Sequence, residues 1–258
     1  MGWVETNRSG LTFYQCQELN NLQVVQGVSG RNCGNLALHT GDDPNRVIER
    51  RKRLLGALDL DLNHLVSGVQ VHGNRIALVD KTAAGLGAFS IEEAVPETDA
   101  LITKDTGIIL ATFTADCLPI FVCDPVTPAV AVIHAGWRGT INGIATDTLK
   151  RMINEFGTSP ADCLVAIGPS ICGACFQVER QLAERFEKIY PQTVIKDKSG
   201  SSVDLQAYIK SDLKAFGIKA DRIYDAKACT SCNSDRFFSY RAEQGVTGRI
   251  MGIIGLRH

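Results

Sequence analysis

Residues 107–139 read GIILATFTADCLPIFVCDPVTPAVAVIHAGWRG and contain three short apolar runs. The runs Gly107–Phe113, Leu118–Val122 and Ala129–Ile133 are rich in strand-forming residues, and Asp, Pro or Gly bounds each of them. Short apolar runs bounded in this way are typical of buried strands. We expect these three runs to form the centre of a sheet.

Helical patterns lie on both sides of this region. Asp43 offers a cap, and Pro44 suits the first turn of a helix that the apolar spacing extends to about Leu58. Downstream, apolar residues keep helical spacing from Ile141 to Phe156, and Gly157 supplies a stop. Two further helices are predicted at Val178–Tyr190 and Leu205–Phe216.

Other strands are predicted in groups along the chain. His64–Val71 and Arg75–Val79 flank the turn-forming trio His72-Gly73-Asn74, which suggests a hairpin-like connection. The remaining predicted strands are Leu164–Ile167, Arg222–Tyr224, Phe237–Tyr240 and Ile250–Ile254. Residues 82–97 are predicted to form a loop, and Lys196–Ser202 a mobile loop. No element is predicted in the polar segment before Asp42. Because strands and helices do not alternate strictly, the pattern predicts a mixed α/β fold.

Length, charge and cysteine usage exclude several classes of protein. The chain has 258 residues, 27 Lys+Arg against 28 Asp+Glu and a net charge of -1, which suits one domain over 1–258 and argues against nucleic-acid binding. The run Arg50–Arg53 is interpreted as a solvated helix face. No apolar run approaches the length of a membrane span, and no signal-peptide pattern is present at the start. Nine cysteines in a chain of this size indicate a reducing compartment, so we expect a cytoplasmic protein that binds no membrane.

Three side chains at strand ends could carry chemistry: His72, Cys117 and His134. They stand in Gln70-Val71-His72-Gly73, Thr114-Ala115-Asp116-Cys117-Leu118-Pro119 and Ile133-His134-Ala135-Gly136-Trp137-Arg138-Gly139. Two imidazoles and a thiolate are ligands that zinc accepts, and a catalytic zinc site keeps one position open for water or substrate. The sequence therefore suggests a zinc site with a hydrolytic or transfer chemistry.

Composition leaves two alternatives open at these residues. A cysteine in an apolar strand is often a packing residue. A Cys–His pair without metal is also possible, with His134 or His72 activating the Cys117 thiolate as a nucleophile. Asp116 is a guess for a proton donor, against a plainer interpretation as a carboxylate bonded within its own turn.

Two further cysteine pairs have the spacing of a zinc knuckle, Cys172-Gly173-Ala174-Cys175 and Cys229-Thr230-Ser231-Cys232. The gap between them is far longer than in a compact zinc ribbon, which argues against a structural zinc site. Redox use of either pair lacks a thioredoxin-like context.

The chain resembles a family known variously as multicopper polyphenol oxidase (laccase-domain) proteins, purine nucleoside phosphorylases and peptidoglycan editing factors. The motifs that carry the resemblance cover nearly the whole chain. They are Asn35–Pro44, Gln70–Gly73, Thr98–Leu101, Thr114–Pro119, His134–Gly139, Ile167–Ile171 and Phe238–Arg241. Of these, the Asp-Cys pair followed by His-Ala-Gly-Trp-Arg-Gly is the specific signal.

The resemblance implies a fold, a site and an activity. The implied fold is a three-layer α/β/α sandwich of the cysteine-hydrolase type, and the implied metal ligands are His72, Cys117 and His134. The implied activity is phosphorolysis of adenosine, inosine, guanosine and methylthioadenosine, with deamination of adenosine at the same site. Phosphorolysis needs an anion-binding group, for which Arg138 is the first candidate and Arg241 the second.

Three rival functions remain. An amidase that removes a wrong amino acid from a cell-wall precursor would use the same Cys and His pair. A copper-dependent polyphenol oxidase is disfavoured because the chain has five histidines and no His-x-His, although the three ligands could accept copper. A binding protein without catalysis is favoured only by residues 25–29, which lack an Arg that relatives commonly carry. Oligomeric state is left open.

Overall fold

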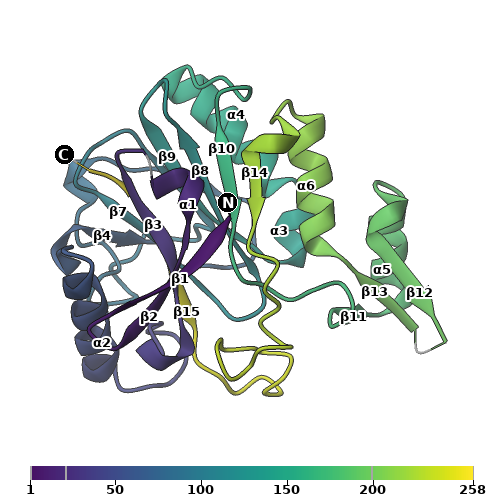
Figure 1. Ribbon diagram of the computed structural model, residues 1–258, viewed down its shortest axis with the longest axis horizontal. Coiled ribbons are helices and arrows are strands. Elements are labelled where there is room, and N and C mark those ends of the chain that lie inside the picture. The colour runs from purple at the N-terminus through teal and green to yellow at the C-terminus, as the bar shows by residue number, and fades with distance from the viewer. Residues whose placement is uncertain (1, 21, 199, 258) are drawn as a thin grey trace.

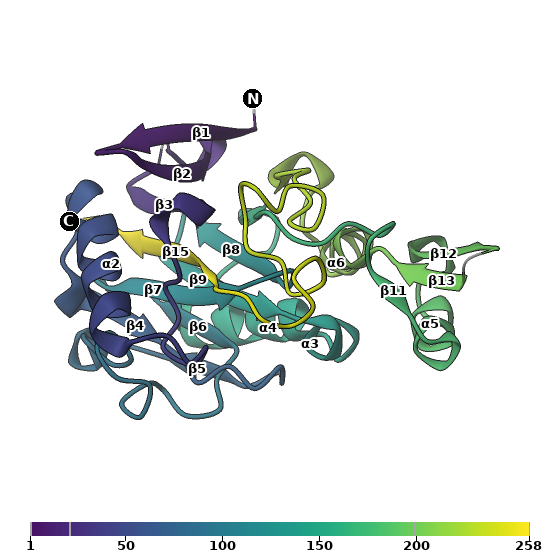
Figure 2. The ribbon, with the colours of Figure 1, turned by 90° about the horizontal axis from the view of Figure 1, so that it is seen from below.

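The computed structural model describes residues 2–20, 22–198 and 200–257. Two six-stranded sheets pack face to face, and helices cover their outer surfaces (Figures 1 and 2). Between the sheets lie side chains such as Val28 and Leu110 from one sheet and Phe121 and Val132 from the other. The expected mixed α/β class is confirmed. The expected sandwich has a single sheet layer between two layers of helices, whereas in the structure two packed sheets lie between the helices.

The first sheet has the strand order β1-β2-β3-β15-β7-β4. Its strands are β1 (Trp3–Arg8), β2 (Leu11–Cys16), β3 (Val24–Ser29), β15 (Ile250–Leu256), β7 (Ile109–Thr114) and β4 (Leu65–Ser67). All pairs are antiparallel except β4 with β7. The outer face of this sheet packs against Leu54 and Leu55 of α2 (Pro44–Ala57).

The second sheet has the strand order β14-β10-β8-β9-β6-β5. Its strands are β14 (Ile223–Asp225), β10 (Leu164–Ile167), β8 (Leu118–Asp124), β9 (Ala129–Ala135), β6 (Ala100–Thr103) and β5 (Ile76–Leu78). Its outer face packs against α4 (Ile144–Phe156) and α6 (Leu205–Ala215) through Leu149, Met152, Ile209 and Leu213. Its central strands β8 and β9 match two of the three apolar runs that were expected at the centre of one sheet. The third run forms β7 of the first sheet, so the expectation of a single sheet is wrong.

A small lobe extends from this side of the body, at the right of Figure 1. It consists of β11 (Gln177–Val178), β12 (Val194–Asp197), β13 (Gly200–Val203) and α5 (Arg180–Glu187). Phe186 of the lobe packs edge-on against Tyr208 of α6, with ring centroids 5.2 Å apart. The shorter elements are α1 (Gln17–Asn20), α3 (Trp137–Ile141) and the 3-10 turns Arg31–Cys33, Leu62–His64, Lys81–Ala83, Pro191–Thr193 and Ala220–Arg222.

Helix boundaries follow local chemistry. The Asp43 side chain accepts a hydrogen bond from the amide of Asn45, as the predicted cap requires. Gly157 closes α4 in the left-handed conformation, with φ of 76°. The predicted helix at 141–156 is divided, because Gly143 takes a left-handed φ of 79° between α3 and α4. The helix predicted at 178–190 begins at Arg180, after β11.

Several expectations about strands and loops are wrong. No hairpin forms around His72, because β4 pairs with β7 of the first sheet and β5 with β6 of the second. Residues 196–197 and 200–202 belong to the paired strands β12 and β13, in which Val194 pairs with Val203; Ser199 lies outside the described residues. Phe237–Tyr240 is not a strand: the segment is irregular, and the amide of Ser239 donates a hydrogen bond to the Glu243 carboxylate.

Two further corrections concern the N-terminal part of the chain. The start of the chain is not without elements, because it supplies β1, β2 and β3. The Arg50–Arg53 run is not uniformly solvated: Arg51 is 1% exposed, and its guanidinium donates to the carbonyls of Leu36, Gly87 and Ala88.

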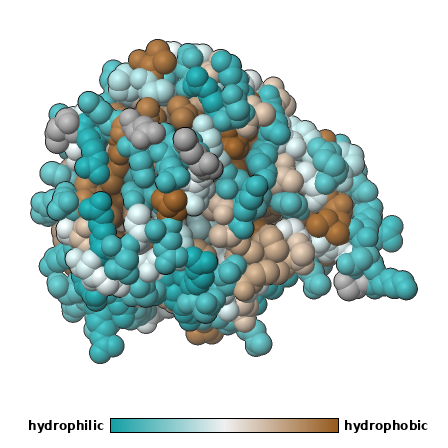
Figure 3. Space-filling view, in the orientation of Figure 1, coloured by the Kyte–Doolittle hydropathy of each residue, from teal (hydrophilic) through white to brown (hydrophobic). Residues whose placement is uncertain are grey.

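The surface in Figure 3 is largely polar, with hydrophobic residues in small groups among hydrophilic ones. None of the helices in residues 2–20, 22–198 and 200–257 is both long and apolar enough to cross a membrane.

Candidate functional site

Strand register brings Cys117 and His134 together. Cys117 directly precedes β8, and His134 lies in β9, where it pairs with Pro119 of β8. Because side chains two residues apart on a strand face the same way, the turn before β8 presents Cys117 beside the imidazole of its neighbour strand. His134 is 2% exposed, whereas Cys117 is half-buried.

Asp99 connects the two histidines. It precedes β6, which pairs with β9, and its Oδ1 lies 2.8 Å from Nδ1 of His134. The same carboxylate accepts hydrogen bonds from the backbone amides of Val71, His72 and Gly73 at 3.2, 3.0 and 2.8 Å. These bonds hold His72 at a φ of 61°, a left-handed conformation that is uncommon outside glycine. Asp99 thus fixes the backbone of one histidine and the ring of the other.

The three predicted ligands converge. The ring nitrogens of His72 and His134 and the sulfur of Cys117 lie within 4.8 Å of one another. The imidazole rings meet edge-on, with centroids 4.8 Å apart. Gly136 makes this approach possible, because a Cβ there would lie 2.8 Å from His72 Cδ2 and 3.2 Å from Cys117 Sγ.

The protonation equilibria of Cys117 and His134 are strongly perturbed. Burial alone would raise the pKa of the Cys117 thiol, but the charge of His134 and hydrogen bonds from His134 and His72 lower it to about 6. Burial would lower the pKa of His134, but the Cys117 thiolate and the Asp99 carboxylate raise it to about 9. Without a metal, the two groups therefore form a thiolate–imidazolium pair at neutral pH.

A cavity of about 480 Å³ opens over these side chains. It is lined by His39, Gln70, His72, Phe113, Thr114, Ala115, Asp116, Cys117, His134, Trp137, Arg138, Ile171, Phe176, Tyr240, Arg241 and Arg249. The wall combines aromatic rings with cationic groups, and its size is that of a small-molecule pocket. Thr114 Oγ1 is buried without a hydrogen-bond partner in the described part of the chain.

Both predicted arginines line this cavity, and sequence reasoning missed a third. The guanidinium of Arg138 stacks on Trp137, 4.5 Å from the ring centroid. Arg241 donates to the carbonyls of Cys175 and Gln177 at 3.1 and 2.9 Å. Arg249 enters from the segment before β15, and burial lowers its pKa despite the nearby Cys117. Three cationic side chains thus surround a site that contains a thiolate.

Asp116 is not bonded within its own turn. Its Oδ1 accepts from the hydroxyl of Thr230 at 2.6 Å, and its Oδ2 accepts from the amide of Arg241 at 2.7 Å. Both oxygens act as acceptors, so the interpretation of Asp116 as a proton donor gains nothing from the geometry. Asp116 instead connects the Cys117 turn to the segment that carries Arg241.

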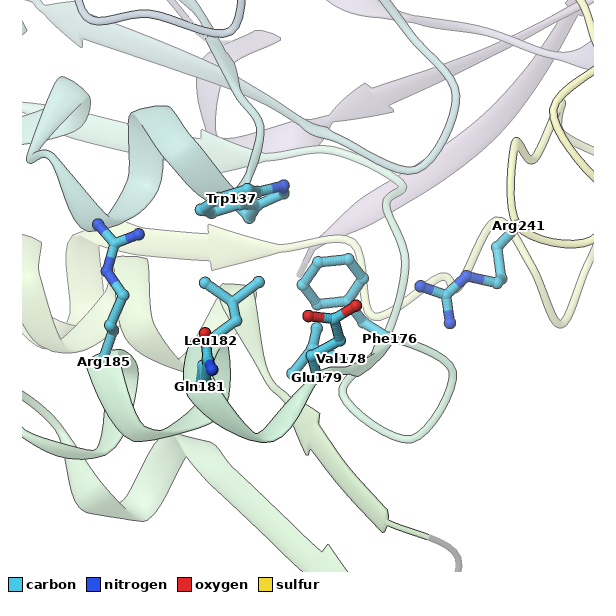
Figure 4. A pocket seen from close by; sticks show the side chains of 8 residues that line it. All are labelled: Trp137, Phe176, Val178, Glu179, Gln181, Leu182, Arg185 and Arg241. Carbon is cyan, nitrogen blue, oxygen red and sulfur yellow. The ribbon is translucent and has the colours of Figure 1, made fainter.

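A second cavity, of about 410 Å³, lies beside the first and shares Trp137, Phe176 and Arg241 with it. Figure 4 shows the Trp137 ring above Leu182 of α5, with Arg185 and Arg241 at opposite ends. The lobe thus forms one wall of a hollow that adjoins the site.

Residues that sequence reasoning did not assign include Asp99, His39 and Arg249. Asp99 stands in the quoted Thr98–Leu101 motif, which was the available signal. Residues 25–29, which lack the Arg that relatives commonly carry, lie outside the site. None of them lines the main cavity in the described structure, and the side chain of Gln26 bonds to the backbone of Cys16.

Comparisons with known proteins place these features in context. The profile described as "Multi-copper polyphenol oxidoreductase laccase" matches residues 24–257. The chain is 36% identical over 228 residues to "Purine nucleoside phosphorylase YlmD" of Geobacillus stearothermophilus, covering 86% of this chain and 83% of that one. It is also 36% identical over 222 residues to "Adenosine deaminase RL5" of an unknown prokaryotic organism, covering 83% and 84%.

A solved structure agrees with the fold. The crystal structure of YlmD from Geobacillus stearothermophilus superposes with a TM-score of 0.94 at 32% identity, covering 99% of this chain and 100% of that one.

Proposed function

Because the chain belongs to the multi-copper polyphenol oxidoreductase laccase family, whose matched relatives bear the names of nucleoside-converting enzymes, we propose that it is a metal-dependent purine nucleoside phosphorylase. The reaction joins phosphate to the ribose of adenosine, inosine, guanosine or methylthioadenosine and releases the base. The same site would also deaminate adenosine to inosine. The nine free cysteines suit a reducing compartment, so we place this activity in the cytoplasm.

One observation carries the proposal. His72, Cys117 and His134 converge at the wall of a cavity that also presents Arg138 and Arg241. Convergent reactive groups next to cationic side chains suit two substrates that bind together, a phosphate ion and a polar molecule with a ring system.

The three side chains fit a zinc ion. Nδ1 of His134 bonds to Asp99, which leaves Nε2 as the nitrogen available to a metal, and metal-binding histidines commonly have such a carboxylate partner. His72 and the Cys117 thiolate would complete the set. A zinc ion bound there would supply Lewis-acid activation of a water molecule or of the substrate.

The protein's own groups would bind and orient the substrates. Arg138 and Arg241 would hold phosphate next to the ribose, since guanidinium groups bind phosphate oxygens in pairs. Trp137, Phe176 and Tyr240 offer faces for the purine. Thr114 Oγ1, which lacks a partner in the described structure, could accept or donate a hydrogen bond to a polar substrate group.

The donor set argues against a laccase-type oxidase in spite of the family's name. Laccase-type clusters need several His-x-His pairs, and the sequence contains none. No methionine lines the cavity in the described structure to act as the axial ligand of a blue-copper centre. Copper could still bind the three ligands in place of zinc, since its affinity for such sites exceeds that of zinc.

A second candidate is an amidase acting on a cell-wall precursor. Asp99, His134 and Cys117 are arranged as orienting carboxylate, base and nucleophile, and the lowered pKa of Cys117 provides a thiolate. This arrangement could attack an amide carbonyl without a metal.

The test is a mass-spectrometric product assay with wild type and Cys117→Ala. Each protein is incubated with adenosine and inosine, with and without phosphate. We expect phosphate-dependent adenine or hypoxanthine with ribose 1-phosphate from wild type, and loss of these products in the variant. Deamination would give inosine from adenosine without phosphate.

Other results would change the assignment. Full turnover and full metal content in Cys117→Ala would contradict the proposed site. Absence of nucleoside turnover by metal-replete wild type would favour the amidase, which is then assayed on amide-linked amino acids of a cell-wall precursor.

A further inference from the structure

The two cysteine pairs outside the described site come together in the fold. The sulfurs of Cys172, Cys175, Cys229 and Cys232 all lie within 4.8 Å of one another. The long gap between the pairs is therefore no obstacle, contrary to the expectation from sequence. A bridge between Ser170 and Cys229 aligns the two segments.

Their spacing fits a tetrahedral ion. A zinc ion with four sulfurs at about 2.3 Å separates the sulfurs by about 3.8 Å. The sulfurs of Cys175 and Cys232 are 3.4 Å apart, close to that value and well beyond the roughly 2.05 Å of a disulfide bond. All four cysteines are free.

The backbone around the sulfurs is arranged as in a metal knuckle. Cys229 Sγ accepts hydrogen bonds from the amides of Cys172 and Cys232 at 3.3 and 3.4 Å. The amides of Cys175 and Phe176 both donate to the carbonyl of Cys172, which makes a tight turn. Amide donors on a sulfur favour its thiolate form and tune a bound metal.

We propose that these four cysteines bind one structural zinc ion. Each thiol releases its proton to solvent as its sulfur–zinc bond forms, so four protons leave and the centre carries a net charge of minus two. The guanidinium of Arg241, bonded to the carbonyl of Cys175, places a positive charge beside this centre. A closed set of four thiolates leaves no position for substrate, which distinguishes this site from the one at His72.

The zinc centre would brace the neighbouring pocket. Thr230, between two of the ligands, donates to Asp116, and the amide of Ile171, next to Cys172, donates to the carbonyl of Asp116. Asp116 directly precedes Cys117. The centre therefore fixes the segments that carry Arg241 and the Cys117 turn.

Metal analysis of purified, reduced protein tests the proposal independently of any enzymatic activity. We expect two zinc equivalents per chain in wild type. Cys175→Ser with Cys232→Ser should lose one equivalent, and His72→Ala with Cys117→Ala should lose the other. Cys33→Ser, which removes a buried thiol outside both sets, should keep both.

Cobalt provides a second readout that does not depend on the folding of the serine variants. Metal-free His72→Ala with Cys117→Ala, titrated with Co²⁺, should show the sulfur-to-metal charge-transfer band and the visible bands of tetrahedral cobalt at one equivalent. Cys232→His should retain zinc, because three cysteines and a histidine form an accepted zinc set and position 232 is exposed.

Two results would overturn the proposal. One is a zinc content that is unchanged in Cys175→Ser with Cys232→Ser. The other is freshly purified wild-type protein in which the four cysteines hold no metal and resist alkylation, and whose mass is lower than that of the reduced chain by two hydrogens per bridge. That result would show that the cysteines form disulfides.

Discussion

At the scale of single residues, the site depends on a carboxylate that serves two histidines. Asp99 accepts four hydrogen bonds, from three consecutive backbone amides and from Nδ1 of His134. An amide in its place would direct a donor at groups that are themselves donors, or force His134 into the tautomer whose Nε2 carries a proton.

We therefore expect Asp99→Asn to weaken metal binding at the His72 site by about 10- to 100-fold. The affinity is measured by competition with a chromophoric chelator. Asp43→Asn is the control, since Asn caps helices as well as Asp does, and its affinity should match wild type. An Asp99→Asn protein with unchanged affinity would show that the carboxylate does not orient His134 toward a metal.

Position 136 requires glycine because there is no room for a side chain. Its backbone conformation is ordinary, since its φ is -74°. A methyl group there would press on His72 and on Cys117 at 2.8 and 3.2 Å. Gly136→Ala should lower metal affinity by about tenfold or more, because it separates two ligands. Gly56→Ala, where a Cβ meets nothing within 4 Å, should leave metal affinity unchanged. Normal metal binding by Gly136→Ala would contradict this packing argument.

The lowered pKa of Cys117 predicts selective alkylation of metal-free protein. The thiolate is the reactive form, so modification of Cys117 by iodoacetamide should rise with pH to half its maximum near pH 6 and be nearly complete at pH 7. Burial raises the pKa of Cys33 to about 11, so that thiol should remain unmodified at pH 7. Peptide mass spectrometry measures both. A rise at Cys117 only above pH 8 would refute the thiolate–imidazolium pair.

At the scale of elements, α2 is attached to the body by a buried arginine. Arg51 donates to the carbonyls of Leu36, Gly87 and Ala88 at 2.7 to 2.8 Å, and its guanidinium lies 4.5 Å from the ring centroid of Phe113. Since Phe113 lines the main cavity, the arginine supports the pocket from behind.

Arg51→Lys should lower the free energy of unfolding by about 3 kcal/mol, because an ammonium group cannot reach all three carbonyls in the plane of a guanidinium. Arg53→Lys, at an exposed position of the same helix, should change it by less than about 0.5 kcal/mol. Urea unfolding measures both. Equal stabilities of the two variants would indicate that the three carbonyl contacts contribute little.

The sequence predicts elements whose signals are local and misses those that depend on distant pairing. The helix from Pro44 carries its own cap, and β8 and β9 are continuous apolar runs, so they are predictable. The connection at His72 carries a turn signal, but its flanking strands join different sheets through β7 and β6, which no local pattern encodes.

The site divides in the same way. Cys117 and His134 are predictable because they are reactive residues at the ends of β8 and β9. His72, which was expected at the end of a strand, lies instead in the loop between β4 and β5. The bonds to Asp99, however, arise from the register of β6 with β9, and Cys172 meets Cys229 through a hydrogen bond across 57 residues. The long gap between the two cysteine pairs in the sequence argues only against the contact of Cys172 with Cys229.

At the scale of the whole molecule, the question is whether the lobe at α5 is a separate folding unit. Its Phe186 and Val203 belong to the same buried cluster as Leu149 and Ile209 of the body. Strands β11, β12 and β13 are too short to be stable alone. We therefore expect residues 1–258 to unfold as one cooperative unit.

The two tryptophans of the chain report on its opposite parts and make this testable. Trp3 lies in β1, and the Trp137 ring faces the lobe, with the guanidinium of Arg185 5.9 Å from its centroid. Fluorescence of Trp3→Phe therefore follows the lobe contact. Fluorescence of Trp137→Phe follows the contact of β1 with the second sheet, where Trp3 donates to the carbonyl of Tyr224. We expect both to change at the urea midpoint that circular dichroism gives for the same variant, since two-state domains show coincident transitions. If the Trp137 signal changes at lower urea than the circular dichroism, the lobe detaches before the body unfolds, and the chain is not a single unit.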